Sequence, residues 1–262
     1  GGYLFYVAKT TNVKDLQNAL KATTLIYDKD GNEAGSLSGQ KGTYVELEGI
    51  SQDLQNAVIA TEDRSFYKNG GINYSRFFLA ILTAGRSGGG STITQQLAKQ
   101  LYSGKASNTL QRLLQKPIEW VIAVEIERYY TKDEIMTLYL NYFDFLHNAV
   151  GIKTAANVYF GKTPSELTIT EAATLIGMCK NPSLFNPVRD AERCRQRRNV
   201  VLSQMVKAGF LSAQDCRTLS ASPLELNFHP IDHKEGEATC LREYLRQVLM
   251  ADKPKRANYR EW

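Results

Sequence analysis

Residues 88–99 decide how the rest of this sequence is interpreted, and they read GGGSTITQQLAK. The glycines let the backbone approach a ligand closely, and a helix is predicted to start at Ser91. The N-terminus of a helix carries unpaired N–H groups and the positive end of the helix dipole. The segment therefore predicts an anion site. Lys99 lies about two turns after Ser91, on nearly the same face of the predicted helix. Gln96 lies between Ser91 and Lys99 and can hydrogen-bond sugar or amide groups.

Two common phosphate-binding motifs are excluded for this segment. The P-loop pattern G-x-x-x-x-G-K-[ST] is absent from it. No predicted strand precedes the glycines, as a dinucleotide-binding fingerprint requires. A flexible loop followed by an ordinary capped helix is the alternative to an anion site.

Helical patterns continue on both sides of this segment. Ser51 is placed to cap a helix that runs to about Arg64, and Thr131 opens a capping box with Glu134. Pro117 predicts a kink or a restart inside a long amphipathic pattern. Further helices are predicted over residues 73–84, 91–102, 108–130, 170–178, 191–208, 212–219 and 237–250.

The first 50 residues have a different character. Residues 24–27 and 43–47 have strand composition, and the turn-rich residues 28–32 between them suit a hairpin. We therefore expect a mainly α fold with a short β-containing lead-in.

The composition excludes a disordered, collagen-like or mucin-like chain, since 43% of the 262 residues are hydrophobic and 23% are charged. Lys and Arg outnumber Asp and Glu by 32 to 27, which gives a net charge of +5. No nucleic-acid-binding motif accompanies these charges, so we expect no nucleic-acid partner. No apolar run reaches the roughly 18 residues of a membrane span. Residues 3–6, which read YLFY, fit either the outer end of a membrane anchor or a short strand.

The cysteines give no support for a metal site. Their spacings contain no C-x-x-C pair, and we expect unpaired thiols in the core at Cys179, Cys194, Cys216 and Cys240. His229 and His233 could join Cys240 as zinc ligands, but the polar surroundings favour solvated loop residues instead. The prediction is therefore no metal ligands among these residues.

Two acidic residues are candidates for acid–base chemistry. Glu62 ends an amphipathic helix, and Glu119 lies between a Lys-Pro-Ile sequence and a tryptophan. Two carboxylates in dissimilar environments suit chemistry at a sugar, where one acts as a base and the other assists the leaving group. A structural ion-pair cluster is the alternative for Glu62. Glu125 and Glu127 have the spacing of solvent-facing or cap positions.

Five segments in one order resemble the signatures of the peptidoglycan glycosyltransferases, glycosyltransferase family 51. The glycine–STITQQL–Lys string is highly specific among them. The matching segments are residues 62–67 (EDRSFY), 89–99 (GGSTITQQLAK), 115–119 (QKPIE), 132–141 (KDEIMTLYLN) and 197–202 (RRNVVL).

The resemblance implies a lysozyme-like, mainly α domain with a smaller membrane-facing jaw lobe. It implies lipid II and the growing glycan strand as substrates, joined into β-1,4-linked glycan with inversion and release of polyprenyl pyrophosphate. The implied location is the bacterial cytoplasmic membrane, with the domain on its outer side and other cell-wall synthesis proteins as partners. A lysozyme-like glycan hydrolase or lytic enzyme is the alternative function.

The resemblance also implies roles for individual residues. Glu62 would be the general base, and Glu119 would assist the departing pyrophosphate. Since a carboxylate cannot neutralise a diphosphate, Glu119 needs Lys116 or a divalent cation, magnesium or manganese. Phosphate and sugar groups would be held by Ser91, Gln96, Lys99, Arg112 and Arg197. Arg197 and its neighbour Arg198 have a structural salt bridge as their alternative.

Some positions depart from the family pattern, and others predict the fold. Asn69 stands where the family usually has histidine, and Gln115 where it usually has arginine. Both acids are nevertheless present, so we expect an active subfamily member. Asn141 and Gly151 are interpreted as fold-defining, through a hydrogen bond and a close backbone approach.

The expected organisation has three parts. Residues 1–50 form a connector that follows a transmembrane anchor, residues 51–222 form the glycosyltransferase domain, and residues 223–262 link it to a transpeptidase domain. The apolar residues 73–84 fit either a helix dipping into the membrane interface or a buried core helix.

Overall fold

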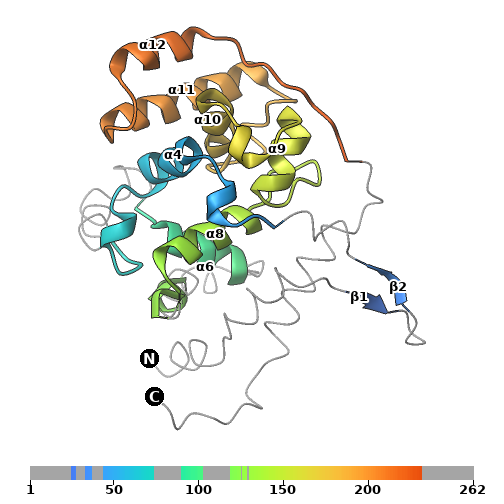
Figure 1. The fold of residues 1–262 in the computed structure, drawn as a ribbon. Helices are drawn as coiled ribbons and strands as arrows, with labels where there is room; N and C mark the ends of the chain where they lie inside the picture. Colours follow the sequence, from blue (N-terminus) through green and yellow to red (C-terminus); the bar gives the residue numbers. More distant parts are fainter. Residues whose placement is uncertain are drawn as a thin grey trace, which may run out of the picture. The chain divides into compact units, whose positions relative to one another are not determined.

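Helices dominate the computed structural model, which confirms the predicted mainly α class (Figure 1). The structure describes residues 25–27, 33–36, 44–73, 90–102, 119–124, 126–128 and 130–231. The predicted helix over 237–250 lies outside these residues. So does the predicted apolar helix over 73–84, except for its first residue. Arg112, Lys116 and Pro117 also lie outside the described residues.

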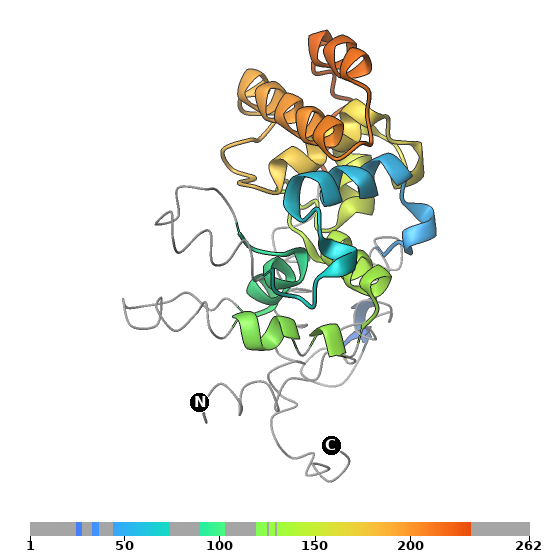
Figure 2. The ribbon, with the colours of Figure 1, turned by 90° about the vertical axis from the view of Figure 1, so that its left-hand side faces the viewer.

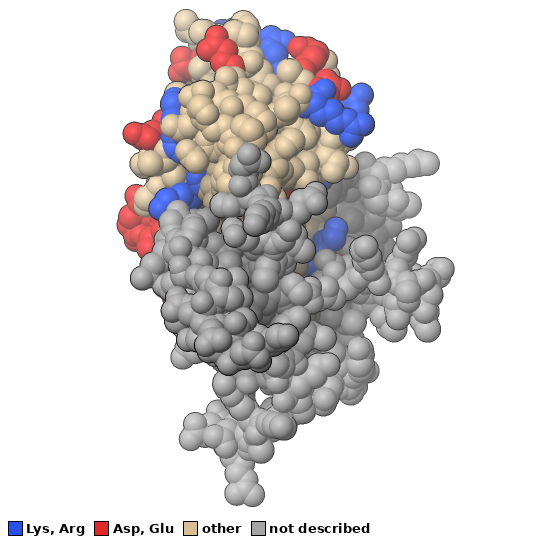
Figure 3. Space-filling view, turned by 90° about the vertical axis from the view of Figure 1, so that its right-hand side faces the viewer, with Lys and Arg blue, Asp and Glu red and all other residues tan. Residues whose placement is uncertain are grey.

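The chain divides into two compact units. The described part of the first unit comes mainly from residues 69–138, and that of the second from residues 45–68 and 139–231. No helix among the described residues combines the length and apolar character that crossing a bilayer requires. On the face shown in Figure 3, basic and acidic side chains of the described residues lie around an uncharged centre.

Three helices form the core of the second unit. They are α4 (Gln52–Glu62), α10 (Ile169–Met178) and α11 (Ala191–Lys207), and each packs against the other two (Figures 1 and 2). A fourth helix, α12 (Ala213–Ala221), packs on α11. The contacts bury large apolar side chains that include Leu54, Leu175 and Leu202.

Side-chain caps fix where these helices begin. The predicted cap of α4 is confirmed, since the Ser51 hydroxyl accepts a hydrogen bond from the amide of Leu54. Thr168, Asp190 and Ser212 cap α10, α11 and α12 in the same way. Each cap satisfies a backbone N–H that has no partner inside the helix. The hydroxyl of Thr131 likewise accepts from the amide of Glu134 at the start of α8 (Lys132–Tyr142).

One helix, α9 (Ile152–Phe160), is absent from the sequence-based expectations. It starts after Gly151 with no side-chain cap, so the usual N-terminal signal is missing. Its C-terminal signal is present, because Gly161 follows it in the left-handed conformation. The remaining helices are α6 (Ile93–Tyr102) and the short 3-10 turns η1 (Leu47–Gly49), η2 (Phe66–Lys68) and η3 (Pro164–Glu166). Residues 119–124 and 126–128 are also helical.

The fold-defining roles expected for Asn141 and Gly151 are confirmed. The side-chain oxygen of Asn141 accepts from the amide of Val45 at 2.9 Å, and its NH₂ group donates to the Val45 carbonyl at 2.8 Å. Gly151 has φ +83°, and a Cβ there would lie 2.6 Å from the carbonyl oxygen of Asn141. A side chain at position 151 would therefore collide with the backbone of α8.

The hairpin expected near the N-terminus is correct in kind but wrong in its second strand. Strand β1 (Leu25–Tyr27) pairs antiparallel with β2 (Glu33–Ser36), not with residues 43–47. The short turn after β1 favours the segment that follows it directly. The backbone N–H and C=O groups of Val45 are instead hydrogen-bonded to the side-chain amide of Asn141. A neighbouring strand would need the same two groups.

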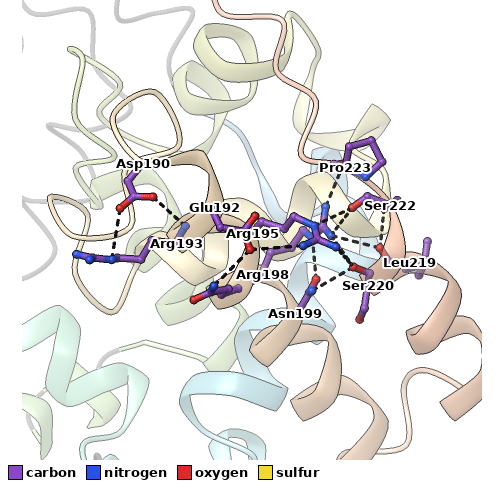
Figure 4. A network of polar contacts seen from close by, with 11 residues as sticks. Asp190, Glu192, Arg193, Arg195, Arg198, Asn199, Leu219, Ser220, Ser222 and Pro223 are labelled. Carbon is purple, nitrogen blue, oxygen red and sulfur yellow. Dashed lines mark hydrogen bonds and ion pairs between the residues drawn. The ribbon is translucent and has the colours of Figure 1, made fainter.

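The chain after α12 lies along the second unit in an extended conformation. The amides of Asn227 and His229 donate to the carbonyls of Tyr159 and Val158 in α9, at 3.0 and 2.7 Å. The start of this segment is held by Arg198, which is 1% exposed (Figure 4). Its guanidinium donates to the carbonyls of Leu219, Ser220, Ser222 and Pro223. Arg198 is therefore a structural residue.

Candidate active site

Glu62 is the last residue of α4 and is half-buried. A negative charge is unfavourable at the C-terminus of a helix, because the unpaired carbonyl groups carry partial negative charge there. The last turn of α4 contains no basic residue of its own. Any compensating charge must therefore come from elsewhere in the fold.

Arg197 of α11 provides a positive charge that interacts with Glu62. Its guanidinium lies 5.7 Å from the centre of the Phe185 ring, and its Nε donates to the carbonyl of Gly177 at 3.4 Å. Burial lowers the pKa of Arg197, while the negative charge of Glu62 raises it. Arginine stays protonated under such shifts. Two of the predicted site residues, Glu62 and Arg197, thus lie near enough for their charges to interact.

Two uncharged groups also lie near Glu62. Tyr139 of α8 is completely buried, and Cys179, which follows α10, is 9% exposed. Burial raises the pKa of both groups well above the ordinary values, and the charge of Glu62 raises them further. Tyr139 and Cys179 share a hydrogen bond, and the Cys179 thiol donates to the carbonyl of Leu175 at 3.7 Å. Both therefore remain neutral at physiological pH.

The cysteines confirm part of the expectation for unpaired core thiols. Cys179 and Cys194 are free and buried, and Cys216 is free and half-buried. Cys240 and His233 lie outside the described residues, so the alternative zinc site is not described as a whole. Within the described residues, no three His, Cys, Asp or Glu side chains lie together as metal ligands would.

The helix that follows the glycines, α6, begins at Ile93, two residues later than expected. Thr92, not Ser91, is its cap: the Thr92 hydroxyl accepts from the Gln95 amide at 3.1 Å. The Gln95 side chain accepts in return from the Thr92 amide at 2.8 Å, which completes a capping box. Both positions 91 and 92 carry a hydroxyl, so the pattern alone could not separate them. Two of the amides near this terminus are thus occupied by the helix's own side chains.

The predicted substrate-binding residues on this segment differ in exposure. Ser91 and Gln96 are half-buried, and Lys99 is exposed. Thr92 also donates from its hydroxyl to the carbonyl of Gly71 at 2.6 Å. The start of α6 is therefore anchored to the chain that follows η2.

A polar cluster in the first unit corrects the expectation for Glu127. This residue does not face solvent: its carboxylate accepts from the Thr94 hydroxyl at 2.6 Å and pairs with Lys132 at 2.7 Å. Lys132 also donates to the side-chain oxygen of Asn69 at 3.3 Å, and that oxygen accepts from the amide of Gly71. Asn69, the departure from the family pattern, thus serves as a hydrogen-bond acceptor. Thr94 is 33 residues from Glu127, and Lys132 belongs to the next helix, so helical spacing does not indicate either partner.

Glu119, the second predicted acid, lies at the start of the described helical residues 119–124 and is 3% exposed. A carboxylate at such depth needs a hydrogen-bond or charged partner. Arg112 and Lys116, the expected basic neighbours, lie outside the described residues. The structure places Ser91, Gln96, Lys99 and Glu119 in the first unit and Glu62 and Arg197 in the second.

The mainly helical fold and its glycine-preceded helix α6 are accompanied by a family match over most of the chain. A model of the family described as Transglycosylase matches residues 30–206. The chain belongs to this family.

Curated relatives carry the names of penicillin-binding proteins. Penicillin-binding protein 2a of Streptococcus pneumoniae is 52% identical over 242 residues, covering 92% of this chain and 32% of the relative. Penicillin-binding protein 1A/1B of Bacillus subtilis is 39% identical, with 81% and 24% covered. Penicillin-binding protein 1A of Escherichia coli is 35% identical, with 87% and 27% covered. The chain thus spans about a quarter to a third of these relatives.

A solved structure, penicillin-binding protein 1A of Haemophilus influenzae, is also similar. It has a TM-score of 0.43 and 24% sequence identity, and the match covers 86% of this chain and 23% of that one.

Proposed function

We propose that this chain is a peptidoglycan glycosyltransferase that polymerises lipid II into β-1,4-linked glycan strands. The observation that carries the proposal is the match of the Transglycosylase model to residues 30–206, which include both acids and the glycine-preceded helix. The curated relatives, named as penicillin-binding proteins, support a role in building the cell wall.

In the proposed reaction, Glu62 acts as the general base. Its carboxylate takes the proton from the C4 hydroxyl of the incoming GlcNAc, whose oxygen then attacks C1 of the MurNAc at the end of the growing chain. The bond from C1 to the pyrophosphate oxygen breaks, and polyprenyl pyrophosphate leaves with inversion at C1.

Glu119 and the basic residues that precede it in the sequence assist the leaving group in this proposal. Lys116 and Arg112 supply positive charge toward the departing pyrophosphate, and Glu119 orients them. Ser91, Gln96 and Lys99 hold phosphate and sugar groups along α6. The exposure of Lys99 suits such a role, because its ammonium can reach a ligand without rearrangement. No step of the proposal depends on a divalent cation.

The proposed setting is the outer face of the bacterial cytoplasmic membrane. Lipid II is anchored there by its polyprenyl chain, so the enzyme must work at the membrane surface. Partners would be lipid II, the growing glycan strand and other proteins of cell-wall synthesis.

The experiment that tests this function supplies the chain with labelled lipid II and, in parallel, with finished glycan strands. We expect long glycan to form from lipid II and the finished strands to keep their length. A hydrolase or lytic enzyme would instead shorten the finished strands and make no polymer. Absence of both reactions would contradict an enzymatic role.

A further inference from the structure

We propose that Glu127 is a positioning residue for α6: it acts through the hydroxyl of Thr94, fixes how the helix is turned about its own axis, and does not touch substrate. The proposal rests on the proposed function, in which Gln96 and Lys99 of α6 hold groups of lipid II. It adds a residue on which the placement of those two side chains depends.

The two sides of α6 differ in exposure. Gln96 is half-buried and Lys99 is exposed, and their spacing of three residues places them on one face. Thr94 is completely buried. Successive residues of a helix are about 100° apart, so Thr94 points about 200° away from Gln96 and about 140° away from Lys99. A contact of Thr94 can therefore set the direction of the other two side chains without reaching a ligand bound to them.

Glu127 holds Thr94 from outside α6. Its Oε1 accepts a hydrogen bond from the Thr94 hydroxyl at 2.6 Å and another from the ammonium of Lys132 at 2.7 Å. The side chains of Glu127 and Lys132 are only 13% and 19% exposed, so water competes little for these bonds. A hydroxyl bonds more strongly to a carboxylate than to a neutral acceptor. The carboxylate thus holds Thr94 by a short bond, while Lys132 holds the carboxylate.

The hydrogen bonds that continue from Lys132 return to the start of α6. Lys132 donates to the side-chain oxygen of Asn69 at 3.3 Å, and that oxygen also accepts from the amide of Gly71 at 3.0 Å. The carbonyl of Gly71 in turn accepts from the hydroxyl of Thr92, the cap of α6, at 2.6 Å. The ring of contacts therefore holds the beginning of the helix at two residues, which limits its rotation.

Close packing against Gly71 fixes the stem of Glu127 as well. A Cβ at position 71 would lie 2.8 Å from Cγ of Glu127 and 3.2 Å from the carbonyl oxygen of Ala123. The backbone at Gly71 also has φ +87°, which glycine adopts without strain. The stem of Glu127 is thus held by packing and its carboxylate by hydrogen bonds, as suits a positioning role.

The test measures kcat and KM for lipid II in variants of the 262-residue chain. Thr94→Val keeps the shape of the side chain and removes the hydrogen bond to Glu127. We expect KM to rise about tenfold, the size that loss of one hydrogen bond to a charged group allows. We expect kcat to stay within about threefold, because groups that hold the ground state and the transition state equally affect KM alone. Thr94→Ser keeps the hydroxyl, so its KM should stay within about twofold of wild type.

Two double-mutant cycles test whether Glu127 acts through α6. Glu127→Gln replaces the carboxylate with a neutral acceptor and should raise KM about threefold on its own. In the Thr94→Val background it should raise KM no further, because the bond that it weakens is already absent. In the Lys99→Met background, Thr94→Val should raise KM less than about threefold, because one of the side chains that it misdirects is gone.

Thr174→Val is the matched control for Thr94→Val. Thr174 is 1% exposed, lies inside α10 in the second unit, and donates from its hydroxyl to the carbonyl of Thr170 at 2.7 Å. The substitution therefore removes a buried threonine hydroxyl from a helix without affecting the contacts of Glu127. Both kcat and KM of this variant should match wild type.

Several results would overturn the inference. A wild-type KM in Thr94→Val is one, and a KM in Thr94→Ser as high as in Thr94→Val is another, since packing and not the hydroxyl would then matter. Additive effects of Glu127→Gln and Thr94→Val would show that Glu127 acts independently of Thr94, as a residue in contact with substrate would. A loss of kcat with a lowered melting temperature and an unchanged KM would show a purely structural role.

Two further outcomes separate this inference from the function on which it rests. If Thr94→Val does not fold, Glu127→Gln decides, because an unchanged KM in that variant contradicts the positioning role. A wild-type chain that forms no polymer from lipid II would overturn the proposed function and the positioning role with it. A wild-type chain that polymerises while the variants keep its KM would overturn the positioning role alone.

Discussion

At the residue scale, two glycines with the same backbone conformation offer a matched comparison. Gly151 and Gly209 both have φ +83°, but a Cβ at 151 would meet the Asn141 carbonyl at 2.6 Å, whereas a Cβ at 209 would meet nothing within 4 Å. Gly209→Ala should lower the free energy of unfolding by about 1 kcal/mol, the cost of the left-handed conformation alone. Gly151→Ala should cost at least about 2 kcal/mol more through the added clash. Urea unfolding measures both, and equal losses would contradict the close approach.

The raised pKa of one thiol, that of Cys194, predicts part of the pH dependence of stability. Burial raises the pKa of Cys194 to about 12, whereas a thiol in an unfolded chain titrates near 8.5. Between these values the unfolded state loses the proton and the native state keeps it. The stabilisation is therefore complete below about pH 8.5 and is lost as the pH rises toward 12.

We expect the free energy of unfolding of Cys194→Ala to fall less steeply above pH 9. The slope of the unfolding free energy against pH should differ from that of wild type by up to about 1.4 kcal/mol per pH unit, the value for one proton. Cys194→Ser, which keeps the size of the side chain without the thiol, should flatten the slope equally. Wild-type slopes in both variants would show that Cys194 ionises freely in the folded protein.

At the element scale, Arg198 determines how the extended segment after α12 is attached. Arg198→Met would leave carbonyls of residues 219–223 without their donor, and we expect a loss of about 3 kcal/mol in unfolding free energy. Proteolysis after Leu219 should become faster in the folded variant. Arg198→Lys should recover part of the loss, because an ammonium has fewer donors and a different geometry. Unchanged proteolysis in Arg198→Met would contradict the attachment.

The sequence predicted most helices because their start signals are local. Ser51 and Thr131 mark the starts of α4 and α8 by capping patterns that span only three or four residues. The helix α9 was not predicted, because it follows a glycine and has no side-chain cap. Its other signal, Gly161 at the C-terminus, was available in the sequence and would have indicated where it ends.

Local patterns could not separate Arg197 from Arg198, although the structure gives them different surroundings. Adjacent residues on a helix point about 100° apart, so one can face α4 and α10 while the other faces the segment after α12. Which is which depends on how the helices pack. The same limit applies to Glu127, whose partners Thr94 and Lys132 come from two other elements.

At the scale of the whole molecule, the contacts that sequence reasoning missed are those between distant segments. Asn141 was expected to make a hydrogen bond, but its partner, Val45, is 96 residues away. That contact also explains why residues 44–47 form no hairpin strand. The five ordered signatures nevertheless indicated the family correctly, because each is short and local.

The central claim for the whole molecule is that it polymerises lipid II with Glu62 as the base. Its most direct test compares Glu62→Gln with Glu48→Gln, which makes the same charge change at an exposed residue of η1. The measurement is the rate of glycan polymerisation from labelled lipid II, together with lipid II binding. We predict that Glu62→Gln binds lipid II but forms no polymer, while Glu48→Gln polymerises at the wild-type rate. Polymerisation by Glu62→Gln at the wild-type rate would contradict the account.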